Sequence, residues 1–329
     1  MGRRQTTDYC GILAIDKPAG ITSHDVVDIV RRATGERRVG HAGTLDPLAT
    51  GLILVCVGPA TRLSNYLTGH DKSYIARIVF GAATDTDDSE GRIVTVYSNC
   101  APGSGLQVLD ECSHEEILND LLGESMQLPP AYSAIKKNGV VAYKAAREGK
   151  NLDLQARPIR IDEANLIDKG EVAVDLNDGE GGRFQAQLPY WDVFLRVSKG
   201  TYIRSIARDL GQQLGCGAHI GNLRRVECSG CKVDDALSLR DLAKIMEDGA
   251  KLPWLDPAKL LNFPVLELDE QQAKDIMNGK LLHLDNLDCA NDGCNYSCVH
   301  EGKLLSICEL CEGSLKPVTV IPGGVCGVA

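Results

Sequence analysis

Residues 40–51 have the sequence Gly-His-Ala-Gly-Thr-Leu-Asp-Pro-Leu-Ala-Thr-Gly. The stretch places a single acid, Asp46, in a predicted turn directly before the strongly apolar run Leu52 to Val57. Pro47 fixes the backbone after the acid, and the glycines at 40, 43 and 51 permit positive φ and close approach. Such a stiff loop suits a carboxylate that acts as a nucleophile or a general base, and it also suits an Asp that caps a turn.

The composition is that of an ordinary soluble globular protein, since 43% of the 329 residues are apolar and 24% are charged. A chain of this length is expected to form about two domains. No apolar run approaches the ~18 residues of a membrane span, and no export signal is recognisable. The sequence therefore predicts a cytoplasmic protein that does not enter a membrane.

The thirteen cysteines are expected to be reduced in that compartment. Zinc-ligand spacing in Cys308-Glu-Leu-Cys311 makes a four-thiolate site with Cys294 and Cys298 conceivable. We favour small apolar side chains in strands and turns, because Cys294 and Cys298 are spaced more widely than in a usual zinc knuckle. No metal is expected.

Charge is distributed unevenly along the chain, whose net value is −10. Residues 131–160 carry seven Lys or Arg against two acids, whereas residues 234–311 carry seven against fifteen. An acidic protein can still present a local basic surface to phosphates. We expect such a surface in the segment 131–160.

The N-terminal third predicts alternating strands and helices. A short strand is expected from Cys10 to Ile15, and a capping box at Thr22 and Asp25 predicts a helix that ends at Gly35. The apolar face of this helix is predicted to contain Val26, Ile29, Val30 and Ala33. Residues 52–57 predict a buried strand, and residues 74–80 and 92–97 predict a strand pair around the acidic turn 84–91.

Further elements follow without a regular βαβ alternation. We expect a second capped helix from Ser113 that stops at Gly123, a strand at 193–197, and helices at 202–214 and 238–248. Residues 252–257 predict a linker, and the chain from about Phe263 predicts a small β module. This order favours an α+β fold over a doubly wound parallel sheet.

The string at 40–51 resembles the catalytic motif of the TruB family of tRNA pseudouridine synthases. Four further segments match that family's pattern in order, over about residues 10–230. They are Lys17-Pro18-x-Gly20-x-Thr22-Ser23; Asp71-Lys72-x-Tyr74 followed by Gly81-x-x-Thr84-x-Thr86-x-Asp88-x-x-Gly91; Pro129-Pro130-Ala131-Tyr132-Ser133-Ala134-x-Lys136; and Ser198 to Ser205, through Asp209-Leu210-Gly211, to Leu223-Arg224-Arg225.

The resemblance implies a pseudouridine synthase fold, in which helices flank a central mixed, mostly antiparallel β-sheet. It also implies a small C-terminal β-barrel-like domain of the PUA type. The implied boundaries are 1–252 for the catalytic domain, with an RNA-binding insertion near 125–160, and 260–329 for the C-terminal RNA-binding domain.

The implied activity is the isomerisation of the T-loop uridine at position 55 of tRNA to pseudouridine, without a cofactor. Asp46 corresponds to the nucleophile, and Arg204 to the arginine that pairs with it and favours its ionised form. Tyr74 corresponds to the tyrosine that stacks on the flipped uracil, and Leu223 to an apolar wall beside it. Whether the carboxylate attacks C6 of the ring or C1′ of the ribose stays open.

The resemblance also implies RNA contacts. His41 is expected to contact RNA where bases are displaced. Tyr132 and Tyr143 interleave with lysines and are expected to stack on bases, and Tyr202 is a further candidate RNA contact. The candidate phosphate contacts are Lys17, Lys136, Lys137, Arg147, Arg157, Arg160, Arg224 and Arg225. The expected partner is the T arm of tRNA, bound by a monomer without guide RNA or an obligate protein partner.

Three other functions compete with this hypothesis. A phosphate-loop nucleotide enzyme is disfavoured because residues 40–51 lack Gly-Lys-[Ser/Thr]. A non-catalytic RNA-binding or tRNA-folding protein of the same fold is disfavoured by the intact Asp46, Tyr74 and Arg204. A guide-RNA-dependent rRNA pseudouridine synthase shares the Asp motif, but the segment 131–160 is more similar to the stand-alone bacterial type.

Overall fold

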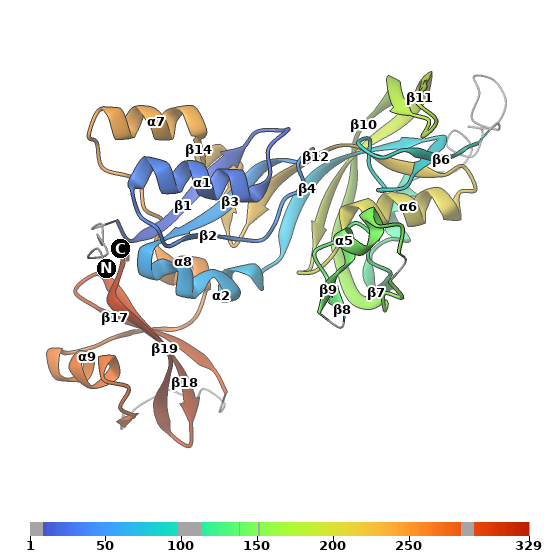
Figure 1. Ribbon diagram of the computed structural model, residues 1–329. Coiled ribbons are helices and arrows are strands. Elements are labelled where there is room, and N and C mark those ends of the chain that lie inside the picture. Colours follow the sequence, from blue (N-terminus) through green and yellow to red (C-terminus); the bar gives the residue numbers. More distant parts are fainter. Residues whose placement is uncertain (1–8, 98–112, 138, 151, 284–292, 329) are drawn as a thin grey trace. The chain divides into compact units, whose positions relative to one another are not determined.

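A computed structural model describes residues 9–97, 113–137, 139–150, 152–283 and 293–328 (Figure 1). Contacts divide the chain into two compact units, and each is described by itself. Unit 1 combines residues 1–70 with residues 226–329, and unit 2 is the continuous stretch 71–225. The boundaries expected from the resemblance, 1–252 and 260–329, differ from this division by contacts and stay a prediction.

Unit 1 is built on the predicted strands at each side of the Asp46 loop. Strand β1 (Gly11–Lys17) runs antiparallel to β3 (Thr50–Val57), with Leu13 opposite Val55. Strand β3 also pairs with β2 (Val39–Ala42), and β1 pairs in parallel with β14 (Leu237–Ser238). Because these strands are nearly all apolar, β1 and β3 are buried along most of their length.

Helix α1 (Ser23–Thr34) confirms the predicted capping box. Thr22 Oγ1 accepts from the Asp25 amide at 3.1 Å, and the Asp25 carboxylate accepts from the Thr22 amide at 2.7 Å. Gly35, at φ 68°, ends the helix as expected. The buried face contains Val26, Val27 and Val30, whereas Ile29 and Ala33 are only half-buried, so the predicted face was rotated.

Outside the C-terminal β module, the remaining elements of unit 1 are short. They are η1 (Gly58–Leu63), α2 (Ser64–Thr68), β13 (Cys231–Lys232), η3 (Val233–Asp235), α7 (Leu239–Glu247) and α8 (Pro257–Leu261). Helix α7 begins at the predicted cap Ser238, and residues 251–256 form the expected irregular segment.

The C-terminal part of unit 1 confirms a small β module. Its five strands have the order β15-β17-β18-β19-β16. The strands are β15 (Val265–Glu267), β16 (Leu282–His283), β17 (Asn295–His300), β18 (Lys303–Cys311) and β19 (Ser314–Cys326). Helix α9 (Glu270–Met277), which the sequence analysis missed, covers one core of this sheet, formed by residues such as Ile276 and Leu315.

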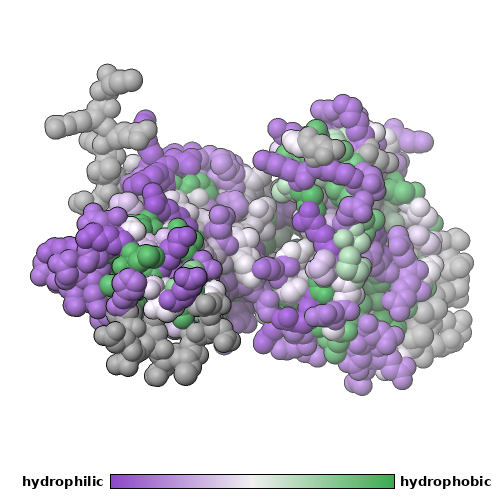
Figure 2. Space-filling view, turned by 90° about the horizontal axis from the view of Figure 1, so that it is seen from below, coloured by the Kyte–Doolittle hydropathy of each residue, from purple (hydrophilic) through white to green (hydrophobic). Residues whose placement is uncertain are grey.

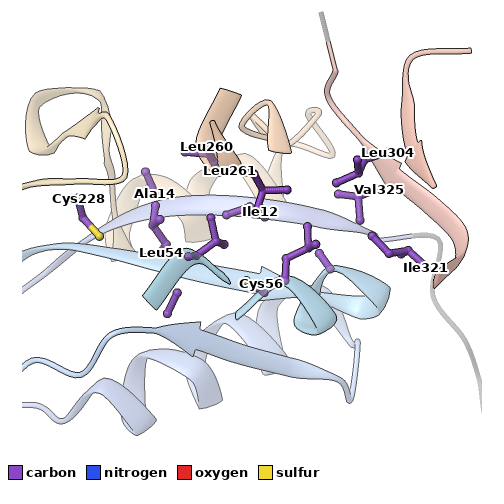
Figure 3. Close-up of a cluster of buried hydrophobic side chains, with 14 of the residues drawn as sticks. Ile12, Ala14, Leu54, Cys56, Cys228, Leu260, Leu261, Leu304, Ile321 and Val325 are labelled. Atoms are coloured by element: carbon purple, nitrogen blue, oxygen red, sulfur yellow. The ribbon is translucent and has the colours of Figure 1, made fainter. Parts of the chain in front are cut away.

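A larger apolar core joins the two sequence-distant parts of unit 1. Ile12 and Leu54 from the N-terminal strands lie in the same cluster as Leu261, Ile321 and Val325 (Figure 3). All five side chains are at most 1% exposed. The C-terminal module therefore shares its core with the strands that flank the Asp46 loop.

Unit 2 contains four antiparallel strands in the order β4-β11-β10-β7. They are β4 (Lys72–Phe80), β11 (Arg183–Val197), β10 (Arg157–Asn177) and β7 (Gly123–Gln127). Strand β12 (Ala218–Cys228) begins in unit 2 and ends in unit 1. The long hairpin of β10 and β11 extends well beyond the strand predicted at 193–197.

Shorter elements complete unit 2. They are β5 (Ala82–Thr84), β6 (Ile93–Val96), α4 (His114–Asn119), β8 (Lys136–Lys137), β9 (Val140–Val141), α5 (Ala142–Arg147) and α6 (Ile203–Gln213). The predicted pairing of 74–80 with 92–97 is wrong, because β6 pairs with β5 across the acidic turn. Helix α4 ends at Asn119, and Gly123 starts β7 instead of stopping the helix.

The predicted α+β class, with mixed but mostly antiparallel pairing, is confirmed. The helices within the described ranges are all too short or too polar to cross a membrane. On the face shown in Figure 2, hydrophilic side chains cover most of the area, and apolar ones lie between them in small groups.

Candidate active site

Asp46 lies in unit 1, in the loop that connects β2 to β3. Gly43 and Gly51 flank it with φ values of 87° and 103°, which a side chain would strain. The Ala49 amide donates to the Asp46 carbonyl at 3.1 Å, so the acid opens a tight turn. The Asp46 side chain is half-buried, which leaves part of it accessible to solvent.

Residues at the start of α1 hold both neighbours of Asp46. Ser23 Oγ donates to the Leu45 carbonyl at 2.9 Å and accepts from the Leu45 amide at 2.8 Å. The Gly20 amide donates to the Pro47 carbonyl at 2.9 Å. Since hydrogen bonds fix the backbone directly before and after it, Asp46 is held in place as a preorganised group must be.

Lys17 corrects one prediction. Its side chain is fully buried, and Nζ donates to the carbonyls of Pro18, Ile21 and Pro47 at 3.0, 2.7 and 3.2 Å. A buried ammonium needs such acceptors, and this one has no exposed surface for a phosphate. Lys17 is therefore an anchor of the Asp46 loop and not an RNA contact.

Arg204 lies in unit 2 on α6, with only 5% of its surface exposed. Nη1 donates to the Thr86 carbonyl at 2.9 Å and lies 3.4 Å from Asp88 Oδ2, while Nη2 donates to the Tyr132 carbonyl at 2.9 Å. The guanidinium thus joins the acidic turn 84–91 to the segment that carries Tyr132. The expected pairing of Arg204 with Asp46 stays a prediction.

Asp88 is a site residue that the sequence analysis quoted in a motif but gave no role. Thr86 Oγ1 donates to Asp88 Oδ1 at 2.6 Å, the Glu90 amide donates to the same oxygen at 3.1 Å, and Thr84 Oγ1 donates to the Asp88 carbonyl at 2.7 Å. The Thr-x-Thr-x-Asp spacing was the signal that could have identified it. Thr86 orients the carboxylate that faces Arg204, and Thr84 holds the Asp88 backbone.

The other predicted catalytic side chains also lie in unit 2. Tyr74 is on β4 opposite Leu195, and it is 7% exposed. Leu223 is on β12 and is 5% exposed. Tyr202 precedes α6, and the side chain of Gln127 binds both its amide and its carbonyl, at 2.9 and 3.1 Å. Because Tyr74 and Leu223 are buried and the start of α6 is fixed, these residues could form a rigid surface against which a base packs.

The predicted RNA contacts differ in exposure. Three of them are exposed, namely Lys136, Arg147 and Arg157. Three others are half-buried, namely His41, Lys137 and Arg224. Arg160 is exposed but lies 3.0 Å from Asp71 and 2.7 Å from Asp162. The Arg225 side chain is fully buried, so its prediction as a surface phosphate contact is wrong.

Aromatic side chains accompany the exposed cations of the segment 131–160. The Arg147 guanidinium lies 5.7 Å from the centroid of the Tyr143 ring, and 37% of Tyr143 is exposed. The Lys137 ammonium also donates to the side chain and to the backbone carbonyl of Asp153. Tyr132 is half-buried, with its backbone held by Arg204.

Across the part of the chain that the structure describes, no group of His, Cys, Asp or Glu side chains is arranged to hold a metal ion. Cys298 and Cys308 lie buried with their sulfurs 3.3 Å apart, whereas Cys294 is exposed. Cys308 and Cys311 are three residues apart on strand β18, so they face opposite sides. This geometry favours the interpretation of these thiols as small core and surface side chains.

Two family models match the chain. The N-terminal domain of the TruB family of pseudouridylate synthases matches residues 31–203, and the C-terminal domain of tRNA pseudouridylate synthase B matches residues 204–258. Among solved structures, an H/ACA RNP bound to a substrate RNA containing 2′-deoxyuridine superposes with a TM-score of 0.65 at 18% identity, over 94% of this chain and 84% of that one. At that identity the likeness concerns the fold.

Curated relatives match over nearly the whole length. The tRNA pseudouridine synthase B of Mycobacterium tuberculosis (strain H37Rv) is 40% identical over 95% of this chain and 98% of its own. That of Leifsonia xyli subsp. xyli is 42% identical over 83% of this chain and 84% of its own. With two family models and such relatives, the chain belongs to the TruB family of pseudouridylate synthases.

Proposed function

We propose that this protein isomerises uridine 55 in the T loop of tRNA to pseudouridine, with Asp46 as the nucleophile. The curated relatives named tRNA pseudouridine synthase B, which this chain matches over most of its length, support the reaction. The observation that carries the role of Asp46 is its loop, in which Ser23, Gly20 and Lys17 hold the residues directly before and after the acid.

The reaction breaks the bond between N1 of uracil and C1′ of the ribose, rotates the base, and joins C5 to C1′. C5 then loses its proton and N1 gains one, so that the product is an isomer of uridine and no electrons are gained or lost overall. A carboxylate can open this sequence by attack on C6 or on C1′. The base must first leave its stack, which costs a few kcal/mol that contacts in the pocket offset.

The remaining residues have supporting roles. Tyr74 stacks on the flipped uracil, and Leu223 provides an apolar surface beside it. Arg204 pairs with Asp46 and supplies positive charge to the reacting carboxylate. Its position on α6 is fixed by Asp88 and by two backbone carbonyls, so this charge is presented in one orientation.

The exposed cations of unit 2 bind the tRNA backbone. Lys136, Arg147 and Arg157 provide phosphate contacts, and Tyr143 provides a face on which a base can stack. His41, on the strand that leads into the Asp46 loop, contacts RNA near the displaced bases. The protein acts as a monomer in the cytoplasm, without guide RNA, a protein partner or a cofactor.

Tritium release tests the proposal. A tRNA transcript labelled at C5 of uridine releases tritium when C5 bonds to C1′, so the wild-type protein should release one equivalent per T loop. Asp46→Asn should lower the rate by at least a thousandfold and leave tRNA binding within about threefold. Asp120→Asn makes the same change at an exposed acid, the C-cap residue of α4, and should leave the rate unchanged.

Two outcomes would contradict the proposal. A wild-type protein that binds tRNA without releasing tritium is a binding or RNA-folding protein of this fold. An Asp46→Asn variant with normal turnover means that another group is the nucleophile.

A further inference from the structure

Arg208 lies one helical turn after Arg204 on α6 and joins the same two segments. Its Nη1 is 3.2 Å from Asp87 Oδ2, and its Nη2 donates to the Leu128 carbonyl at 2.8 Å. Arg204 makes the corresponding contacts with Asp88 and the Tyr132 carbonyl. Because residues four apart share a helix face, the two arginines attach turn 84–91 and segment 128–132 to α6 at two points each.

The backbone of Asp87 also connects this turn to β12. The Ile220 amide donates to the Asp87 carbonyl at 3.0 Å, and the Ser89 amide donates to the Ile220 carbonyl at 2.9 Å. Leu223 follows three residues later on the same strand. Asp87 has a φ of 61°, a conformation that few residues other than glycine, Asn and Asp adopt. The turn is therefore held, in a strained form, between α6 and β12.

The Leu128 carbonyl is the point at which α6 holds the root of the segment with exposed cations. It accepts from Ser205 Oγ at 3.0 Å as well as from Arg208. Residues 129–137 continue from this point to Lys136 and Lys137. A single guanidinium thus connects the acidic turn to the start of that segment.

We propose that Asp87 and Arg208 are a positioning pair for the reaction, which fixes the turn that holds Arg204 and anchors the root of segment 128–137. The inference rests on the proposed function, because it assigns the pair a role in that reaction. Asp87 acts through Arg204 and its turn, and Arg208 acts through both the turn and the segment.

Electrostatics indicate that the pair serves more than the fold. Burial raises the pKa of the Asp87 carboxyl to about 6, and the facing Asp209 and Asp88 add to the rise against the attraction of Arg208 and Arg204. Since the folded pKa lies above its ordinary value, the stabilising contribution of this group is complete below about pH 4 and is lost as pH rises through about 6. At neutral pH the Asp87 carboxylate is charged, so its contribution to the free energy of unfolding is lower than at acid pH. The carboxylate nevertheless keeps its ion pair with Arg208.

Asp87→Asn is the decisive variant, because Asn has nearly the same shape and also adopts positive φ. At pH 7.5 we expect kcat for tritium release to fall about tenfold, with KM within twofold and with Tm unchanged or higher. In the wild type, kcat should fall as Asp87 is protonated below about pH 6, and this acid limb should be absent from Asp87→Asn.

Changes at Arg208 test the connection to segment 128–137. Arg208→Ala should lower kcat and also raise KM for tRNA severalfold, because it removes one of the two donors to the Leu128 carbonyl as well as the partner of Asp87. Arg208→Lys should recover part of the loss in kcat, since one ammonium can reach one of the two acceptors. The matched control is Asp175→Asn, which breaks the exposed pair with Arg183 and should change neither parameter.

Three results would overturn the proposed pair. They are a kcat of Asp87→Asn equal to that of the wild type, a fall in its kcat near pH 6 like that of the wild type, or a loss of kcat in the variants that is fully explained by a lower Tm. Hydrogen exchange separates this proposal from the proposed function. If the wild type releases no tritium, the proposed function fails, and faster exchange of peptides 84–91 and 128–137 in Arg208→Ala then supports only the structural part of the proposal, that Arg208 fixes these two segments. Unchanged hydrogen exchange of these two peptides overturns the proposed pair.

Discussion

Lys17 shows that a charge in a motif can serve the fold of a site instead of its ligand. Lys17 was predicted as a phosphate contact within a motif of the resembled family, and most lysines do lie at the surface. The structure buries this one against three carbonyls, and one of them, on Pro47, is thirty residues away in sequence. Such a non-local acceptor has no signature in the sequence around Lys17. The same limit explains Arg225, whose burial the sequence did not predict.

Replacement of Lys17 by Met tests its role as an anchor. Lys17→Met should lower the free energy of unfolding by about 2–4 kcal/mol, because the three hydrogen bonds of the buried ammonium to the carbonyls of Pro18, Ile21 and Pro47 are lost. Urea denaturation measures this loss. Lys136→Met, at an exposed lysine, should change stability by less than about 0.5 kcal/mol and should weaken tRNA binding instead. A stable Lys17→Met variant with weakened binding would restore Lys17 as an RNA contact.

Elements were predictable where their signals are local. The capping box at Thr22 and the glycine at 35 located both ends of α1, since each acts within one helical turn. Helix α9 had an equally local signal in the capping box of Asp269 and Gln272, and it was missed because the tail was interpreted as strands alone. The partner of β6 was wrong, because strand pairing depends on the whole sheet.

The site divides in the same way. The loop of Asp46 and the oriented acid Asp88 both lie in motifs that the sequence displays, so they were available before the structure. The hydrogen bonds from α6 to Leu128, Tyr132 and Thr86 were not, because they join segments up to 118 residues apart. Sequence patterns predict which residues form the candidate site, whereas tertiary contacts determine how those residues are held.

Gly211 provides a test of how α6 packs. In a helix interior Gly→Ala ordinarily stabilises by up to about 1 kcal/mol. At Gly211, however, an added Cβ would lie 2.2 Å from the Ala218 amide nitrogen and 2.4 Å from the Gly217 carbonyl carbon. Gly211→Ala should therefore destabilise by about 1–3 kcal/mol, as thermal denaturation can measure. Gln212→Ala, at the exposed next position, should be nearly neutral; a stabilised Gly211→Ala variant would contradict this packing.

The whole molecule combines an acidic chain with a basic segment in unit 2. Binding of tRNA should weaken as salt rises, because counterions are released from the phosphates that the cations neutralise. Lys136→Ala and Arg147→Ala should each reduce the slope of log K against log salt by about 0.7–0.9. Filter binding at several salt concentrations measures this, with Lys244→Ala at an exposed position of α7 as a control. A slope that is flat in the wild type would contradict the basic surface.

The shared core of unit 1 predicts that the C-terminal module supports the region of Asp46. Ile321 is fully buried in the cluster that contains Ile12 and Leu54. Ile321→Ala should lower the free energy of unfolding by about 2–5 kcal/mol. Val318→Ala, on the same strand but 51% exposed, should cost little. Equal effects of the two changes in urea denaturation would mean that the module folds without this core.

Unit 1 is discontinuous in sequence, whereas unit 2 runs without interruption from residue 71 to residue 225. A ribosome that adds about 5–20 residues per second therefore delivers the last segment of unit 1 roughly 5–20 s after unit 2 has been synthesised. Until almost the end of that interval, the strands beside Asp46 lack Ile321 and Val325, two of their partners in the core. Asp46, the proposed nucleophile, is thus the first of the four predicted catalytic residues to be synthesised, but it belongs to the unit that is completed last. A nascent chain contains the basic segment 131–160 before the core beside Asp46 is complete.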